Sequence, residues 1–119
     1  MKIEGEAELV RVFVGESDQW HGRPLHAAIV EEARRAGLAG ATVIRGLMGY
    51  GAHSRIHTVK ILRLSEDLPV VIEIVDRSDR VRAFLPTLDR MVGEGLLTIE
   101  TVHVIAYRHD TGAGPGGGV

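Results

Sequence analysis

The segment from Arg45 to Gly51 has the spacing of residue types most suited to chemistry in this chain. Gly46, Gly49 and Gly51 follow Arg45, and Arg55 lies four residues beyond them. Because glycine has no Cβ, this spacing lets backbone N–H groups approach an anion, and the arginines add positive charge. The segment is no Rossmann fingerprint, because it ends a predicted strand, and no P-loop, because no Gly-Lys-Ser/Thr follows. The alternative interpretation is a bulge or bend where a long hairpin leaves its sheet.

Positive charge is concentrated around this segment. Residues 33–65 contain no Asp or Glu and hold six cations, which are Arg34, Arg35, Arg45, Arg55, Lys60 and Arg63. The other residues hold 8 cations and 16 anions. A local excess of positive charge on an acidic background favours a site for a small anion, and chance clustering of solvated side chains is the alternative. The net charge of −2 argues against general nucleic-acid binding.

Titratable and nucleophilic side chains form no recognisable catalytic pattern. No serine lies in a Gly-x-Ser-x-Gly elbow, cysteine is absent, and no two carboxylates are placed for acid–base work. His53 and His57 have the four-residue spacing of metal ligands on a helix, but two histidines make only half of a zinc site. The sequence therefore predicts a protein that is not an enzyme, with no catalytic residue, no required cofactor and no metal site.

Hydrophobic periodicity predicts elements in the order β-α-β-β-α-β. Strands are expected at 6–14, 40–51, 70–76 and 98–108, with 59–64 as a returning hairpin arm, and helices at 24–36 and 78–92. Ser78 is expected to cap the second helix, and Pro86 to kink it. With right-handed crossovers, this order predicts a ferredoxin-like α+β fold, in which both helices cover one face of an antiparallel sheet.

The sheet face without helices is predicted to be too apolar to meet water. It carries Leu9, Phe13, Val71, Val75, Ile105 and Tyr107, with Arg11, Glu73 and His103 among them. Such a face favours self-association. Arg11 and Glu73 are expected to pair across neighbouring strands, as interface architecture or as part of a site.

Size and composition indicate one domain. The chain has 119 residues, 45% of them hydrophobic, and no apolar run approaches the roughly 20 residues that span a membrane. Residues 1–109 are expected to form the domain, and the glycine-rich residues 110–119 a disordered tail. The first residues lack the apolar core of a signal peptide, so a cytoplasmic location is expected.

Several motifs together resemble the uncharacterised PII-like domain family of bacteria and archaea. They are Gly40-Ala41-Thr42-Val43-Ile44-Arg45-Gly46-Leu47-Met48-Gly49-Tyr50-Gly51 followed by His57, Pro69 to Asp76, and Gly15-Glu16 followed by Gly22 to Leu25. The resemblance implies a trimeric ferredoxin-like fold related to the nitrogen-regulatory PII and CutA proteins. It further implies that adenine nucleotides bind in clefts between subunits, and that a mobile loop reports the ligand to a protein partner. That loop corresponds to residues 50–61, with His53, Ser54, Arg55 and His57.

The resemblance also assigns ligand-binding residues. Arg45-Gly46 matches the Lys/Arg-Gly beside the PII nucleotide, Glu73 matches a glutamate near base and ribose, and Arg108 matches a phosphate-binding arginine. Ala106 stands where PII has another arginine, and the lysine-bearing loop before the last strand is absent. We therefore expect AMP or ADP in preference to ATP, or a similar small anion, at Arg45, Gly46, Gly49, Gly51, Glu73 and Arg108. A CutA-like trimer that binds divalent metal is the alternative.

Overall fold

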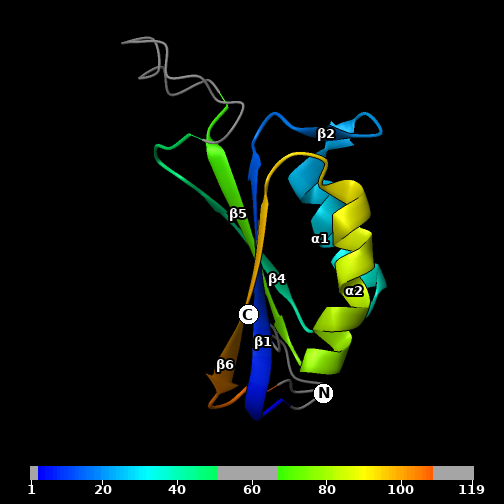
Figure 1. The fold of residues 1–119 in the computed structure, drawn as a ribbon, viewed down its shortest axis with the longest axis vertical. Coiled ribbons are helices and arrows are strands. Elements are labelled where there is room, and N and C mark those ends of the chain that lie inside the picture. Colours follow the sequence, from blue (N-terminus) through cyan, green and yellow to red (C-terminus); the bar gives the residue numbers. More distant parts are fainter. Residues whose placement is uncertain (1–2, 51–66, 109–119) are drawn as a thin grey trace, which may run out of the picture.

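The described part of the chain forms a four-stranded sheet with two helices on one side. A computed structural model of the protein describes residues 3–50 and 67–108. The sheet is antiparallel, in the order β4-β5-β1-β6, and a short hairpin, β2-β3, is separate from it. The strands are β1 (Gly5–Gly15), β2 (Gln19–Trp20), β3 (Arg23–Pro24), β4 (Ala41–Arg45), β5 (Pro69–Asp76) and β6 (Leu96–Val104), and the helices are α1 (Leu25–Arg35) and α2 (Ser78–Met91). Both helices lie on the same side of the sheet (Figure 1), as the predicted ferredoxin-like α+β fold requires.

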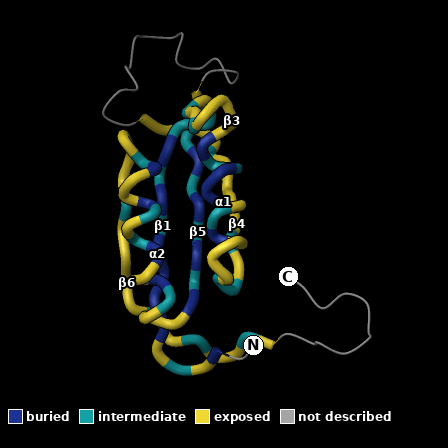
Figure 2. Tube along the Cα trace, turned by 90° about the vertical axis from the view of Figure 1, so that its right-hand side faces the viewer, coloured by how far each residue is buried: buried dark blue, intermediate teal, exposed yellow. Residues whose placement is uncertain are grey.

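Strands β1 and β5 form the centre of the sheet. Val10, Val12 and Val14 of β1 pair with Ile74, Ile72 and Val70 of β5, respectively. Because successive side chains of a strand point to opposite faces, these alternate residues share one face. They are the side chains that the helices cover. Figure 2 shows the result, in which the central strands are largely buried whereas β6, at one edge, is largely exposed.

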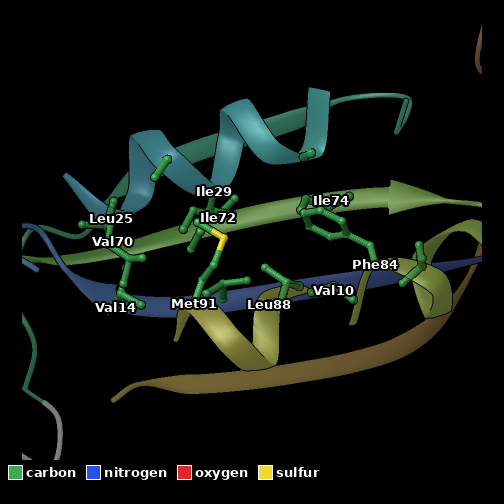
Figure 3. Packing of buried hydrophobic residues seen from close by; sticks show 14 residues of the cluster. Val10, Val14, Leu25, Ile29, Val70, Ile72, Ile74, Phe84, Leu88 and Met91 are labelled. Atoms are coloured by element: carbon green, nitrogen blue, oxygen red, sulfur yellow. The ribbon is translucent and has the colours of Figure 1, made fainter. Parts of the chain in front are cut away.

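The hydrophobic core lies between the helices and this face of the sheet. Its helical members are Leu25, Ala28, Ile29 and Ala33 of α1 and Val81, Phe84, Leu88 and Met91 of α2, all of them buried. Spacings of three and four residues place each set along one face of its helix. Figure 3 shows side chains of both helices and of β1 and β5 pointing into the same space. Neither α1 nor α2 covers the opposite face of the sheet, which we call the open face (Figure 1).

The ends of the helices differ from the prediction. Ser78 is the first residue of α2 and does not cap it; Arg77 occupies the N-cap position, without a side-chain capping bond. The Ser78 hydroxyl instead donates to Glu8 Oε1 at 2.7 Å. Helix α2 runs through Pro86 as one helix to Met91.

The last strand is shorter than expected, which changes what lies on the open face. Strand β6 covers Leu96–Val104, so Ile105 and Tyr107 follow the strand. His103 pairs with Glu6, and paired residues of antiparallel strands share a face. Its face is therefore that of Val10, which the helices cover, and the prediction that placed it on the open face is wrong. The predicted hairpin arm 59–64 and the tail 110–119 lie outside the described residues.

Candidate functional site

Arg11 lies at the centre of the open face and holds two carboxylates. Its Nε donates to Glu73 Oε2 at 2.8 Å, and its terminal nitrogen forms an ion pair with Glu100. The bond with Glu73, and then the bond with Glu100, raises the pKa of the Arg11 guanidinium above its ordinary value. The predicted pairing of Arg11 and Glu73 is confirmed. Glu73 is thereby held in place in the middle of an apolar surface.

A cavity of about 290 Å³ opens beside Glu73 on the same face. It is lined by Ile3, Ala39, Gly40, Thr42, Glu73, Val75, Val104, Ala106 and Tyr107. Most of these side chains are apolar, and the polar groups are the Glu73 carboxylate, the Thr42 hydroxyl and the Tyr107 hydroxyl. The cavity therefore lies between strands β4 and β5 of the sheet and the segment that follows β6. Of its lining residues, the site prediction included only Glu73.

The wall of the cavity at Ala39 is fixed from two sides. The backbone N–H of Ala39 donates to Asp76 Oδ2 at 2.9 Å, and the Ala39 carbonyl accepts a hydrogen bond from the Tyr107 hydroxyl at 3.0 Å. Asp76 is fully buried, and the N–H of Arg77 donates to its other oxygen at 2.6 Å. Arg80 lies 3.5 Å from the Asp76 carboxylate and donates to the carbonyl of Gly37. The turn between α1 and β4 is therefore attached to β5, to α2 and to the segment after β6.

A second carboxylate lies next to Asp76 in the sheet, on the helix side. Glu8 pairs with Asp76 in the ladder between β1 and β5 and is buried. The Nε and a terminal nitrogen of Arg82 each donate to one of its carboxylate oxygens at 2.8 Å. The hydrogen bonds from Arg82 and Ser78 lower the pKa of the Glu8 carboxyl, against the opposing effect of burial. This pair stabilises the junction of β1 and α2 and lies away from the cavity lining.

The predicted anion-binding segment, from Arg45 to Gly51, begins at the last residue of β4. Arg45 forms an ion pair with Glu16, and the N–H of Gly46 donates to the carbonyl of Pro69 at 2.7 Å. A Cβ at Gly46 or Gly49 would lie 2.7 or 3.0 Å from the ring of Pro69. These two glycines therefore allow close packing against Pro69, and the N–H of Gly46 already has an acceptor.

The described residues place the predicted ligand-binding groups in three positions. Glu73 lines the cavity, and Arg108 is exposed and follows Tyr107, which also lines the cavity. Arg45 pairs with Val70 in the ladder, whereas Glu73 pairs with Thr42, so the two side chains belong to opposite faces. Gly51 and the loop residues His53, Ser54, Arg55 and His57 lie outside the described residues.

Residues 3–50 and 67–108 offer neither a metal cluster nor a membrane helix. Within these ranges, no group of three or more His, Cys, Asp or Glu side chains is arranged to hold a metal ion. No helix there is long and apolar enough to cross a membrane.

Proteins of similar sequence match nearly the whole described fold. The family model DUF190, described as "Uncharacterized ACR, COG1993", matches residues 7–104. A UPF0166 protein of Aquifex aeolicus is 38% identical over 98 residues, which cover 82% of this chain and 92% of that protein. A UPF0166 protein of Methanocaldococcus jannaschii is 34% identical over 107 residues, which cover 89% and 96%.

Three solved structures share the fold at low sequence identity. A protein of Thermus thermophilus that is provisionally named a PII-like signaling protein has a TM-score of 0.60 and 20% identity, with 85% of this chain and 91% of that chain covered. CPII of Thiomonas intermedia, in a structure bound to ADP and bicarbonate, has a TM-score of 0.54 and 16% identity, with 83% and 88% covered. CutA of Synechococcus elongatus has a TM-score of 0.57 and 12% identity, with 90% and 85% covered.

The family model covers most of the chain, and both curated relatives match over nearly their whole lengths. The predicted resemblance is thereby confirmed, and the chain belongs to the DUF190, or UPF0166, family, an uncharacterised family with a PII-like fold.

Proposed function

We propose that this chain is a cytoplasmic PII-like sensor, without enzymatic activity, that binds AMP or ADP in preference to ATP. The observation that carries the proposal is the cavity beside Glu73. The resemblance assigns Glu73 to the surroundings of the base and ribose, and this residue lines the open-face cavity. CPII, which shares the fold, has been determined with bound ADP.

The chemistry of the cavity suits a nucleoside. Val75, Val104 and Ile3 give it apolar walls for a flat base, while Thr42 and Glu73 offer polar groups for base or ribose. Small-molecule pockets have volumes of about 300–1,000 Å³, so a cavity of about 290 Å³ is suited to a base and sugar, with the phosphates outside. Arg11 occupies Glu73 Oε2, so Oε1 is the oxygen that we assign to the ligand.

The negative charge of the phosphates has to be balanced by cations, and we assign two arginines to this role. Arg108 follows the cavity-lining Tyr107 and is exposed. Arg45 lies on the other face of the sheet, so an Arg45 that contacts the same nucleotide has to come from another copy of the chain. This arrangement supports a site in the cleft between subunits of a homotrimer, with Gly46, Gly49 and Gly51 beside Arg45. A similar small anion that engages these arginines is the broader form of the same proposal.

The proposed output is a change in the loop at residues 50–61. This loop follows Arg45 by a few residues, so a ligand held by Arg45 would bias its conformation and hence its contact with a protein partner. The exposed side chains of Leu47 and Met48, just before the loop, and of Tyr50, its first residue, offer apolar surface to that partner. Capture experiments with and without ADP would identify the protein partner.

Calorimetry with AMP, ADP and ATP tests the proposal. We expect the parent to bind AMP and ADP more tightly than ATP, and Arg45→Ala to lose about tenfold to a hundredfold in ADP affinity through a lost charge-assisted hydrogen bond. Arg77→Ala is the matched control, because Arg77 is exposed and pairs with Asp79 at the start of α2. Absence of nucleotide binding by the parent would overturn the proposal.

A second comparison isolates the cavity. Glu73 and Glu100 both pair with Arg11, but only Glu73 lines the cavity. Glu73→Gln is expected to weaken ADP binding and Glu100→Gln to leave it unchanged. The same titrations with Zn²⁺, Cu²⁺ and Ni²⁺ examine the CutA-like alternative, which a response to metals alone would favour.

A further inference from the structure

The segment that follows β6 forms one wall of the cavity. Val104 is the last residue of β6, and Val104, Ala106 and Tyr107 all line the cavity. The opposite lining comes from Thr42 of β4 and Val75 of β5. Since β6 and β4 are the two edges of the sheet, this segment connects one edge to the other across the open face.

Only one side-chain hydrogen bond found in the described residues ties this segment to the rest of the molecule. The Tyr107 hydroxyl donates to the carbonyl of Ala39 at 3.0 Å, across 68 positions of sequence. Ile105, by contrast, is 81% exposed, and residues 105–108 belong to no strand. Tyr107 is therefore the anchor of the segment.

The acceptor of this bond is itself rigid. The N–H of Ala39 donates to Asp76, whose carboxylate is fully buried and also accepts from the backbone of Arg77. Arg80 of α2 holds the carbonyl of Gly37 in the same turn. The peptide that receives Tyr107 is thus fixed by the core, and it fixes the tyrosine in turn.

We propose that Tyr107 is a positioning residue that places Arg108 at the mouth of the cavity. This inference rests on the proposed function, because it assigns Arg108 to the phosphate of a nucleotide whose base lies beside Glu73. Arg108 is adjacent to Tyr107 and lies outside any strand, so the anchored tyrosine limits where the guanidinium can reach. Ala106, on the cavity side, leaves that space free for the ligand. Pre-organisation of this kind reduces the ordering cost of binding.

Tyr107→Phe tests the inference because it removes the hydroxyl and keeps the ring that lines the cavity. A neutral hydrogen bond corresponds to about a twofold to tenfold change in affinity, and we expect a loss of that size for ADP. Amide exchange in residues 105–108 of the unliganded protein should become faster, while the melting temperature changes little.

A double-mutant cycle with Arg108→Ala separates positioning from a merely structural role. If Tyr107 acts through Arg108, adding Tyr107→Phe to Arg108→Ala should cost almost nothing further in ADP affinity. The inference would be overturned if the two substitutions lowered ADP affinity independently, so that their effects multiplied. It would also be overturned if Tyr107→Phe or Arg108→Ala alone left ADP affinity unchanged. In each of these cases the proposed function would still rest on Arg45 and Glu73. A parent protein that binds no nucleotide would overturn both.

Discussion

At the scale of single residues, Glu8 shows how a buried charge is kept. The residue is 6% exposed, and its carboxylate accepts hydrogen bonds from Arg82 and Ser78. These bonds lower its pKa in the folded protein. A group whose pKa is lower when folded stabilises the fold above its unfolded pKa, and this contribution disappears as the pH falls through the folded pKa.

Replacement of Glu8 should therefore have an effect that depends on pH. We expect Glu8→Gln to melt at a lower temperature than the parent at pH 7, because the charge-assisted bonds from Arg82 are lost. The difference should shrink as the pH falls below about 4.3, where an unfolded glutamate is protonated. Thermal melts at a series of pH values check this. The exposed Glu6→Gln on the same strand is the control, and a pH-independent difference for Glu8→Gln would contradict the assignment.

Individual contacts of the site differ in how far they could be predicted. Arg11 and Glu73 were predictable because they are cross-strand neighbours of opposite charge in strands with clear alternation. The contact of Tyr107 with Ala39 was not, since it joins a segment whose alternation is typical of a strand to a turn 68 residues away, and no local pattern indicates such a tertiary contact. A tyrosine in an apolar stretch was the one available signal, because a partly buried hydroxyl usually finds a hydrogen-bond partner.

At the scale of elements, strand and helix patterns were more informative than their ends. The alternation over 6–14 and the helical periodicity over 24–36 and 78–92 predicted β1, α1 and α2 correctly. The end of β6 was missed because Ile105 and Tyr107 continue the apolar alternation past the point where pairing with β1 stops at Gly5. Ser78 was misassigned because its hydroxyl meets Glu8, a tertiary contact that overrides the local capping preference.

Gly46, directly after β4, donates a backbone hydrogen bond to Pro69 at the start of β5. A substitution at Gly46 should therefore destabilise the sheet. A Cβ at this position would lie 2.7 Å from the Pro69 ring and 3.2 Å from the Pro69 carbonyl oxygen. We expect Gly46→Ala to lower the free energy of unfolding by about 1–3 kcal/mol, as other overpacking changes do. Gly40→Ala is the matched control, because its Cβ would meet no atom within 4 Å. Denaturant titration measures both, and equal stabilities would show that the contact relaxes at no cost.

At the scale of the whole molecule, the open face raises the question of assembly. Ile44 of β4 and Leu96 of β6 are 46% and 54% exposed, at opposite edges of that face. Between these edges, Phe13 of β1 and Val71 of β5 form a cross-strand pair, and both are only partly buried. An apolar surface of this extent favours association with further copies of the chain.

The expected assembly is a homotrimer of about 39 kDa, formed from three chains of 12.9 kDa. Light scattering at micromolar concentration should give this mass for the parent. Ile44→Glu places a charge on the open face, where it would be desolvated in an interface, so we expect smaller species that keep their secondary structure. Ala83→Glu, on an exposed position of α2, should leave the mass unchanged.

The same variant joins assembly to binding. Ile44→Glu leaves Glu73, Tyr107 and Arg108 within one chain, but it separates them from the Arg45 that another copy would supply. Its affinity for ADP should therefore fall about as far as that of Arg45→Ala, and combining the two changes should cost little more. An Ile44→Glu protein that is dissociated and still binds ADP as the parent does would place the whole site within one subunit. A parent that is monomeric at micromolar concentration would refute the trimer and leave the apolar open face to another partner.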